Sequence, residues 1–115
     1  MLRVLFALVL LTTSLTAQTS GAYYEALTVS TSAVGFSGTL VNNLAVMGPL
    51  VSCRGRLETA SIRVRHDGTD PTSGEGVLID VDSQVVINGF SAVQSFRAIR
   101  TAGTNAVLRV HCGQF

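Results

Sequence analysis

The chain has 115 residues, enough for one domain, and 47% of them are apolar against 13% charged. This balance excludes a disordered tail and allows a buried core. Eight arginines oppose seven acidic residues, lysine is absent, and the formal net charge is +1. A protein that binds nucleic acid by neutralising phosphates needs a larger positive excess, so we expect no nucleic-acid partner.

The first 22 residues have the layout of a secretory signal peptide. A short positive start precedes an apolar run from Val4 to Leu11, and small and polar residues follow it. The apolar run is too short to cross a bilayer, and a cleavage site is expected after Ala17 or Ala22. We predict that residues 1–22 are either removed on export or kept as an arm that extends onto a neighbouring subunit. Residues 23–115 are predicted to form one domain.

From residue 23 onward the apolar residues recur with a period of two, which is typical of strands. In Ile62–Arg65 apolar residues alternate with arginines, and Ala106–Cys112 alternates in the same way. Asp67-Gly68 is a hairpin-type dipeptide, and Asn88-Gly89 marks another turn. The pattern predicts an all-β protein, a small antiparallel sandwich of the jelly-roll or Ig-like kind with seven or eight short strands. The strands are expected at residues 26–30, 33–39, 50–54, 57–65, 77–81, 84–87, 95–100 and 106–111, with one helical turn at 41–47.

Cys53 and Cys112 are the only cysteines in the chain. Alternation places Cys53 on the same face as Val51, and Cys112 on the same face as Val110, so both cysteines are expected to point inward. In an exported protein this pair favours one disulfide, whereas in the cytoplasm the two would be buried thiols. Their spacing matches no zinc or redox-active motif, so we expect no metal site and no cofactor.

The sequence does not indicate catalytic chemistry. His66 and His111 are the only candidates for a histidine general base, and neither has sequence neighbours that complete a triad. The acidic loop that contains Asp67 and Asp70 lacks the EF-hand pattern, and turn capping explains its aspartates better than calcium binding. We therefore predict a protein that is not an enzyme and has no small-molecule substrate.

Five arginines are candidates for contact with a partner. Arg54 and Arg56 are two residues apart, as are Arg63 and Arg65, so each pair projects from one face of its strand. If the two strands are neighbours, their guanidinium groups form a ridge, and Arg97 on a later strand is the fifth candidate. Arginine is enriched at interfaces because its planar fork binds carboxylates. The alternative is a solvated face on which acidic residues neutralise these charges.

Three stretches of the sequence resemble a group of small virion proteins of tailed phages. The shared pattern is a hairpin of the form IRxRxDGTxPT, then an FRAIR strand, then a terminal strand that ends in LRV. The resemblance implies a β-sandwich that decorates a capsid or tail and carries no catalytic residues. It predicts a location on the virion surface, with capsid or tail proteins, or copies of the chain itself, as partners. The stretches are residues 25–36, 56–76 and 94–110.

A second interpretation is a secreted or periplasmic β-sandwich that serves as an adhesion or accessory binding module. The hairpin at residues 67–72 resembles that of Ig-like accessory domains at the ends of some secreted glycosidases. In this interpretation a disulfide between Cys53 and Cys112 holds the domain together. The state of the N-terminus separates the two possibilities, since an exported module is expected to lose its signal segment.

Overall fold

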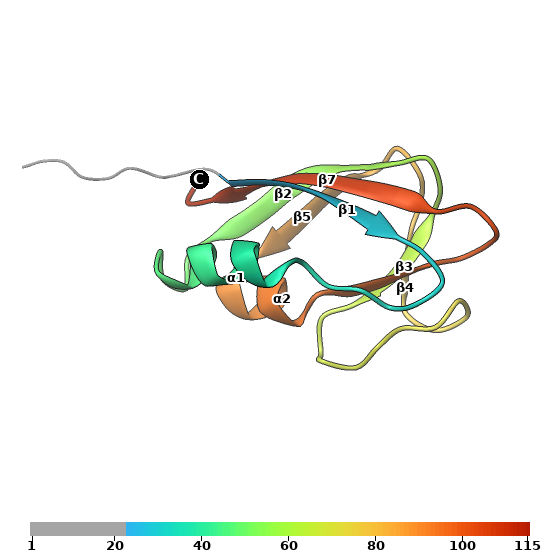
Figure 1. Cartoon of the computed structure of the whole chain (residues 1–115), viewed down its shortest axis with the longest axis horizontal. Helices are drawn as coiled ribbons and strands as arrows, with labels where there is room; N and C mark the ends of the chain where they lie inside the picture. Colours follow the sequence, from blue (N-terminus) through green and yellow to red (C-terminus); the bar gives the residue numbers. More distant parts are fainter. Residues whose placement is uncertain (1–22) are drawn as a thin grey trace, which may run out of the picture.

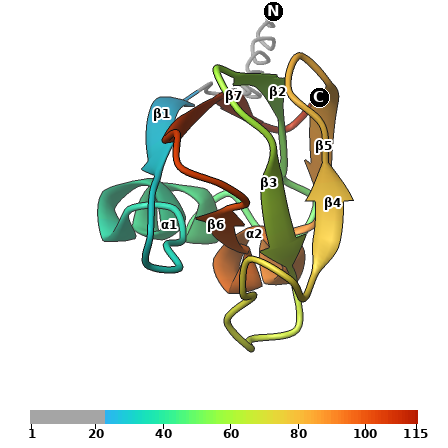
Figure 2. The same cartoon turned by 90° about the vertical axis from the view of Figure 1, so that its right-hand side faces the viewer.

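The computed structural model describes residues 23–115, so the predicted export signal or arm at residues 1–22 lies outside the described part. In the described part, seven strands form two antiparallel sheets, which confirms the predicted all-β sandwich. The strands are β1 (Tyr23–Val29), β2 (Ser52–Glu58), β3 (Ile62–Arg65), β4 (Val77–Ile79), β5 (Gln84–Asn88), β6 (Arg97–Arg100) and β7 (Ala106–Gly113). One sheet has the order β1-β7-β2-β5 and the other the order β4-β3-β6 (Figures 1 and 2).

The alternating sequence pattern places one face of each sheet in the core. In β7, Leu108 and Val110 are buried whereas Arg109 is exposed. In β3, Ile62 and Val64 are fully buried, and the arginines that follow them point to the other side. Side chains of successive strand residues point to opposite faces, so this alternation gives each sheet one apolar and one polar face.

The single strand predicted at residues 57–65 is wrong, because the chain bends in its middle. Thr59 has a φ of 84°, a left-handed conformation that a β-branched residue rarely adopts. The bend ends β2 at Glu58, and β3 begins at Ile62 in the other sheet. The Ser61 hydroxyl accepts a hydrogen bond from the Val81 amide at 3.0 Å, which ties the bend to the chain segment after β4.

The strand predicted at residues 33–39 is also wrong, since only Val34 makes an isolated bridge, and helix α1 (Gly38–Ala45) follows. The Ser37 hydroxyl accepts a hydrogen bond from the Leu40 amide at 3.1 Å and so caps the first turn. Glu25 of β1 in turn accepts a 2.6 Å hydrogen bond from the same hydroxyl. Buried Leu40 and Leu44 have helical spacing, so packing against the core favours a helix here.

A second helix, α2 (Phe90–Ser95), was not predicted, and the strand expected at residues 95–100 begins two residues later, at Arg97. The chain enters α2 through Gly89, whose φ of 92° is readily adopted only by glycine. Figure 1 shows the two helices together beneath the four-stranded sheet, next to the three-stranded sheet. No helix among residues 23–115 is both long enough and apolar enough to cross a membrane.

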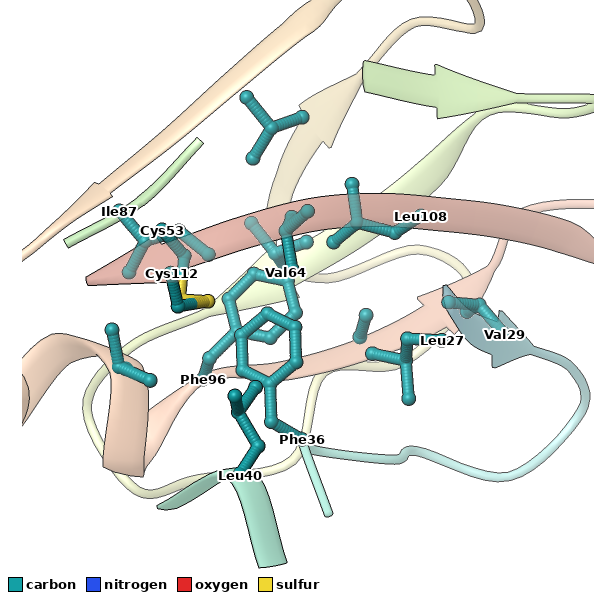
Figure 3. Close-up of a cluster of buried hydrophobic side chains, with 14 of the residues drawn as sticks. Leu27, Val29, Phe36, Leu40, Cys53, Val64, Ile87, Phe96, Leu108 and Cys112 are labelled. Atoms are coloured by element: carbon teal, nitrogen blue, oxygen red, sulfur yellow. A yellow bond between two sulfur atoms is a disulfide. The ribbon is translucent and has the colours of Figure 1, made fainter. Parts of the chain in front are cut away.

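The core between these layers contains a disulfide. Cys53 of β2 and Cys112 of β7 lie directly opposite each other, both are fully buried, and their sulfur atoms are bonded. The rings of Phe36 and Phe96 stack with their centroids 4.9 Å apart, and Figure 3 shows them within the same buried cluster. The expectation that both cysteines point inward and pair is confirmed. The bond joins the two central strands of the four-stranded sheet.

Candidate functional site

The outer face of the four-stranded sheet carries a cluster of basic, polar and aromatic side chains, which we call the cationic face. Its members are exposed and alternate with buried or half-buried residues, so they point away from the core. They line an open depression of about 510 Å³. The cationic face comprises Tyr24 of β1, Arg109 and His111 of β7, Arg54 and Arg56 of β2, and Gln84 of β5.

The strand register packs four basic side chains into a compact grid. Arg54 lies opposite His111, and Arg56 lies opposite Arg109. Directly opposite Cα atoms in antiparallel strands are about 4.5–5.5 Å apart, and alternate residues along a strand are about 6.8 Å apart. Like charges directly opposite each other destabilise a sheet. The Arg56–Arg109 pairing places two positive charges side by side, and Glu58 offsets one of them through its ion pair with Arg109.

Arg109 is held in place by its neighbours on the same face. Its Nε donates to Oε1 of Glu58 at 3.0 Å, and its Nη1 donates to the Tyr24 hydroxyl at 2.9 Å. The hydrogen bond to Tyr24 and the interaction with Glu58 raise the pKa of Arg109 above its ordinary value. Tyr24 also contacts the His111 ring edge-on, with ring centroids 5.5 Å apart. Arg109 thus has one charge partner within the domain.

Within the described part of the chain, Arg54 and Arg56 have no such charge partner. Both are exposed, and among residues 23–115 neither forms an ion pair with a carboxylate. Nη1 of Arg56 donates to the main-chain carbonyl of Asp82 at 2.6 Å, which fixes the side chain without neutralising it. The guanidinium of Arg54 lies over the Phe115 ring, 5.0 Å from its centroid. Both positive charges of this pair therefore remain available to a partner.

The predicted ridge of four arginines does not form, because the two strands that carry the arginine pairs are not neighbours. Arg54 and Arg56 belong to the four-stranded sheet, whereas Arg63 and Arg65 belong to the three-stranded sheet, so their strands are not neighbours. Arg97 of β6 lies opposite Arg65, on the sheet that contains the second pair. The five candidate arginines thus divide into a group of two and a group of three.

The group of three holds the loop of residues 66–76 in place. Nε of Arg63 donates to the Ser73 carbonyl at 3.2 Å, and its Nη1 donates to the Gly76 carbonyl at 3.0 Å. Nε of Arg97 donates to Oδ1 of Asp70 at 2.8 Å. These contacts give both arginines a structural role within the chain, and their predicted contact with a partner stays a prediction.

Arg65, the last residue of β3, forms an ion pair with Asp67 of this loop. The hydrogen bond from Arg65, together with one from the Thr69 amide, lowers the pKa of Asp67 to about 2. The carboxylates of Asp67 and Asp70 are therefore paired with arginines, which argues against a calcium site in this loop. Among residues 23–115, no three His, Cys, Asp or Glu side chains converge at a spacing that could hold a metal ion.

The sequence pattern did not predict Arg109, His111 or Tyr24 as contact residues. One signal was present, since Arg109 and His111 are two residues apart on a strand with clear alternation, in the same way as Arg54 and Arg56. What joins the two pairs is the alignment of β7 with β2, which no local pattern reveals.

Comparison with known proteins identifies no relative. No family model, no curated protein and no solved structure matches this chain. The resemblance to phage virion proteins therefore remains a hypothesis based on three stretches of sequence.

Proposed function

We propose that this chain is a non-enzymatic binding domain that works in an oxidising compartment and contacts a macromolecular partner through the cationic face. The observation that carries the proposal is the contrast between two groups of arginines. Arg63, Arg65 and Arg97 are used to hold a loop, whereas Arg54 and Arg56 project from a strand without a carboxylate partner among residues 23–115.

The buried disulfide supports a site of action outside the cytoplasm. Disulfides persist in secreted and periplasmic proteins and are rare where glutathione and thioredoxin keep thiols reduced. Cys53 and Cys112 are both fully buried and bridge the two central strands, which is the position of a structural cross-link. The signal-like sequence of residues 1–22 is consistent with this proposal.

The geometry of the cationic face is better suited to binding than to catalysis. His111 contacts Tyr24 and lies opposite Arg54, and among residues 23–115 it forms no ion pair with a carboxylate of the kind that orients a histidine general base. The depression is wide and open, a shape that suits a macromolecular surface more than an enclosed small molecule. Arginine and tyrosine are among the residues that contribute most to protein interfaces.

A virion-surface protein that contacts capsid or tail neighbours is the second candidate function. The feature that favours it, besides the sequence resemblance, is an exposed sheet edge. β4 is an edge strand, and its Val77 and Leu78 are 66% and 48% exposed. An exposed apolar edge can pair with an identical edge on another copy, which is a simple route to repeated assembly.

The two candidates predict different forms of the native protein. Intact-mass measurement of protein purified from the producing cells should show a chain that starts at Gln18 or Tyr23 and has a closed disulfide. An intact Met1 with two free thiols would contradict export and favour assembly inside the cell. Light scattering of the same sample adds a second test, since a strictly monomeric protein at high concentration would contradict the virion proposal.

A further inference from the structure

We infer that the partner presents an extended acidic polypeptide segment, with carboxylates on alternate residues, which lies along β2 on the cationic face. This inference rests on the proposed function, because it names the kind of partner that the same face binds. Three features of the face support it: the spacing of the unpaired arginines, the distribution of charge between β2 and β7, and the apolar side chains at its border.

The spacing of Arg54 and Arg56 matches that of an extended polypeptide. Both residues project from the same face of β2, and Gly55 separates them. Alternate residues of any extended chain are also about 6.8 Å apart on one side, so acidic residues at alternate positions can meet the two guanidinium groups in register. Each guanidinium can bind a carboxylate through two parallel hydrogen bonds, which gives geometric as well as electrostatic selectivity.

The distribution of charge favours β2 over β7 as the track for the acidic segment. Glu58, the last residue of β2, offsets the charge of Arg109 on β7, and the Tyr24 hydroxyl accepts a further hydrogen bond from Arg109. On β2, neither arginine has a carboxylate partner within residues 23–115. The unneutralised positive charge therefore lies on the part of β2 that contains Arg54 and Arg56, before Glu58.

Apolar side chains border the arginines and offer contact area to a peptide. Val86 of β5 lies opposite Arg54 and is 47% exposed, and Phe115 beside Arg54 is 63% exposed. A polypeptide that alternates acidic with uncharged residues can use both kinds of surface. A polysaccharide partner is less favoured, because the chain has no tryptophan and Tyr24 is engaged by both Arg109 and His111.

Synthetic peptides test the inference directly on the oxidised full-length protein. One peptide alternates glutamate with threonine, and a second has the same composition with its glutamates in one block. Binding is followed by NMR through the amide shifts of β2 and β7 at low ionic strength, where charge pairs are least screened. We expect the alternating peptide to bind at least about threefold more tightly than the block peptide, because only it places carboxylates in register.

Substitutions test the role of the two arginines. In the double variant Arg54→Gln/Arg56→Gln, binding of the alternating peptide should weaken about tenfold, whereas the single variant Arg100→Gln should change it less than about twofold. Arg100 is a matched control because it belongs to the other sheet and donates to the Asn105 side chain. The variant Arg54→Lys/Arg56→Lys keeps both charges without the planar fork, so it should recover only part of the affinity.

The possible results separate this inference from the proposed function. Equal affinity for the two peptides would overturn the inference that the bound segment carries carboxylates on alternate residues. The protein could instead bind a heparin hexasaccharide and neither peptide, and lose this binding in Arg54→Gln/Arg56→Gln. That result would overturn the inference that the partner is a polypeptide, and the cationic face would remain a binding site. If no probe shifts the β2 amides, or if Arg100→Gln weakens binding as much as the double variant, both proposals are wrong. Thermal melts of all variants show whether each is folded.

Discussion

Removing the buried disulfide should cost this domain a large part of its stability. The change is the double variant Cys53→Ala/Cys112→Ala, which abolishes the bond between the central strands β2 and β7. In the chain-entropy model, a cross-link stabilises the folded state because it restricts the unfolded chain. The magnitude therefore follows from the length of chain that the bond closes.

That length is large for so small a protein. The two cysteines are 59 positions apart, and a loop of this size corresponds to about 4 kcal/mol in the chain-entropy model. Domains of ordinary size have net stabilities on the order of 5–15 kcal/mol. The bond therefore contributes roughly a quarter or more of the total, and the variant should be marginally stable.

Urea denaturation followed by circular dichroism measures the effect. For an m-value of about 1–2 kcal/mol/M, the midpoint should fall by about 2–4 M. Wild-type protein unfolded under reducing conditions is the control, because it keeps both sulfur atoms and lacks only the bond. A loss below about 1 kcal/mol in both samples would refute the loop-entropy reasoning. A loss in the alanine variant alone would assign the effect to side-chain packing.

Three further predictions test the loop, the strand pairing and the core. The pKa of the Asp67 carboxyl should be about 2 when measured by NMR titration, because Arg65 stabilises its charged form. The contribution of this ion pair to stability is present above the ordinary pKa of 3.8 and is lost as the pH falls through about 2. A titration midpoint near 3.8 would exclude the ion pair in solution. Gly55→Ala should destabilise the fold by about 3 kcal/mol or more in urea denaturation, since the new Cβ would lie 1.7 Å from the Arg109 carbonyl oxygen. A change below about 1 kcal/mol would show that β7 does not approach Gly55 so closely. Phe96→Ala should cost about 3–5 kcal/mol by the same assay, because the ring is fully buried, and a near-neutral result would contradict its place in the core.

The sequence by itself determined the class of fold and the inward side of those strands in which apolar and polar residues alternate clearly. In Ala106–Cys112 and Ile62–Arg65, strict alternation predicted which side chains are buried, and the structure agrees. The same alternation placed Cys53 and Cys112 on inward faces, and they are bonded. These inferences succeeded because the two-residue period of a strand is a local property of the backbone.

The local sequence pattern did not predict secondary structure correctly where packing against the core overrides the strand propensity of the residues. Residues 33–39 contain β-branched and aromatic side chains that favour a strand, yet α1 begins at Gly38, three residues before the helical turn predicted at 41–47. It begins there because Ser37 caps it and buried Leu40 and Leu44 meet the core. Helix α2 is only six residues long, too short for a helical period to stand out from the surrounding sequence. Both elements depend on contacts with distant parts of the chain.

Only the tertiary structure decided which arginines meet. Arg54 and Arg109 are far apart in sequence, and they share a face because β2 pairs with β7 in one particular register. Arg63 has the same local pattern as Arg54, yet it binds carbonyl groups of a loop on the other sheet. Alternation predicts the side of the strand on which a residue lies. The residues beside it on that side depend on the order and register of the strands, which are determined by packing between distant parts of the chain.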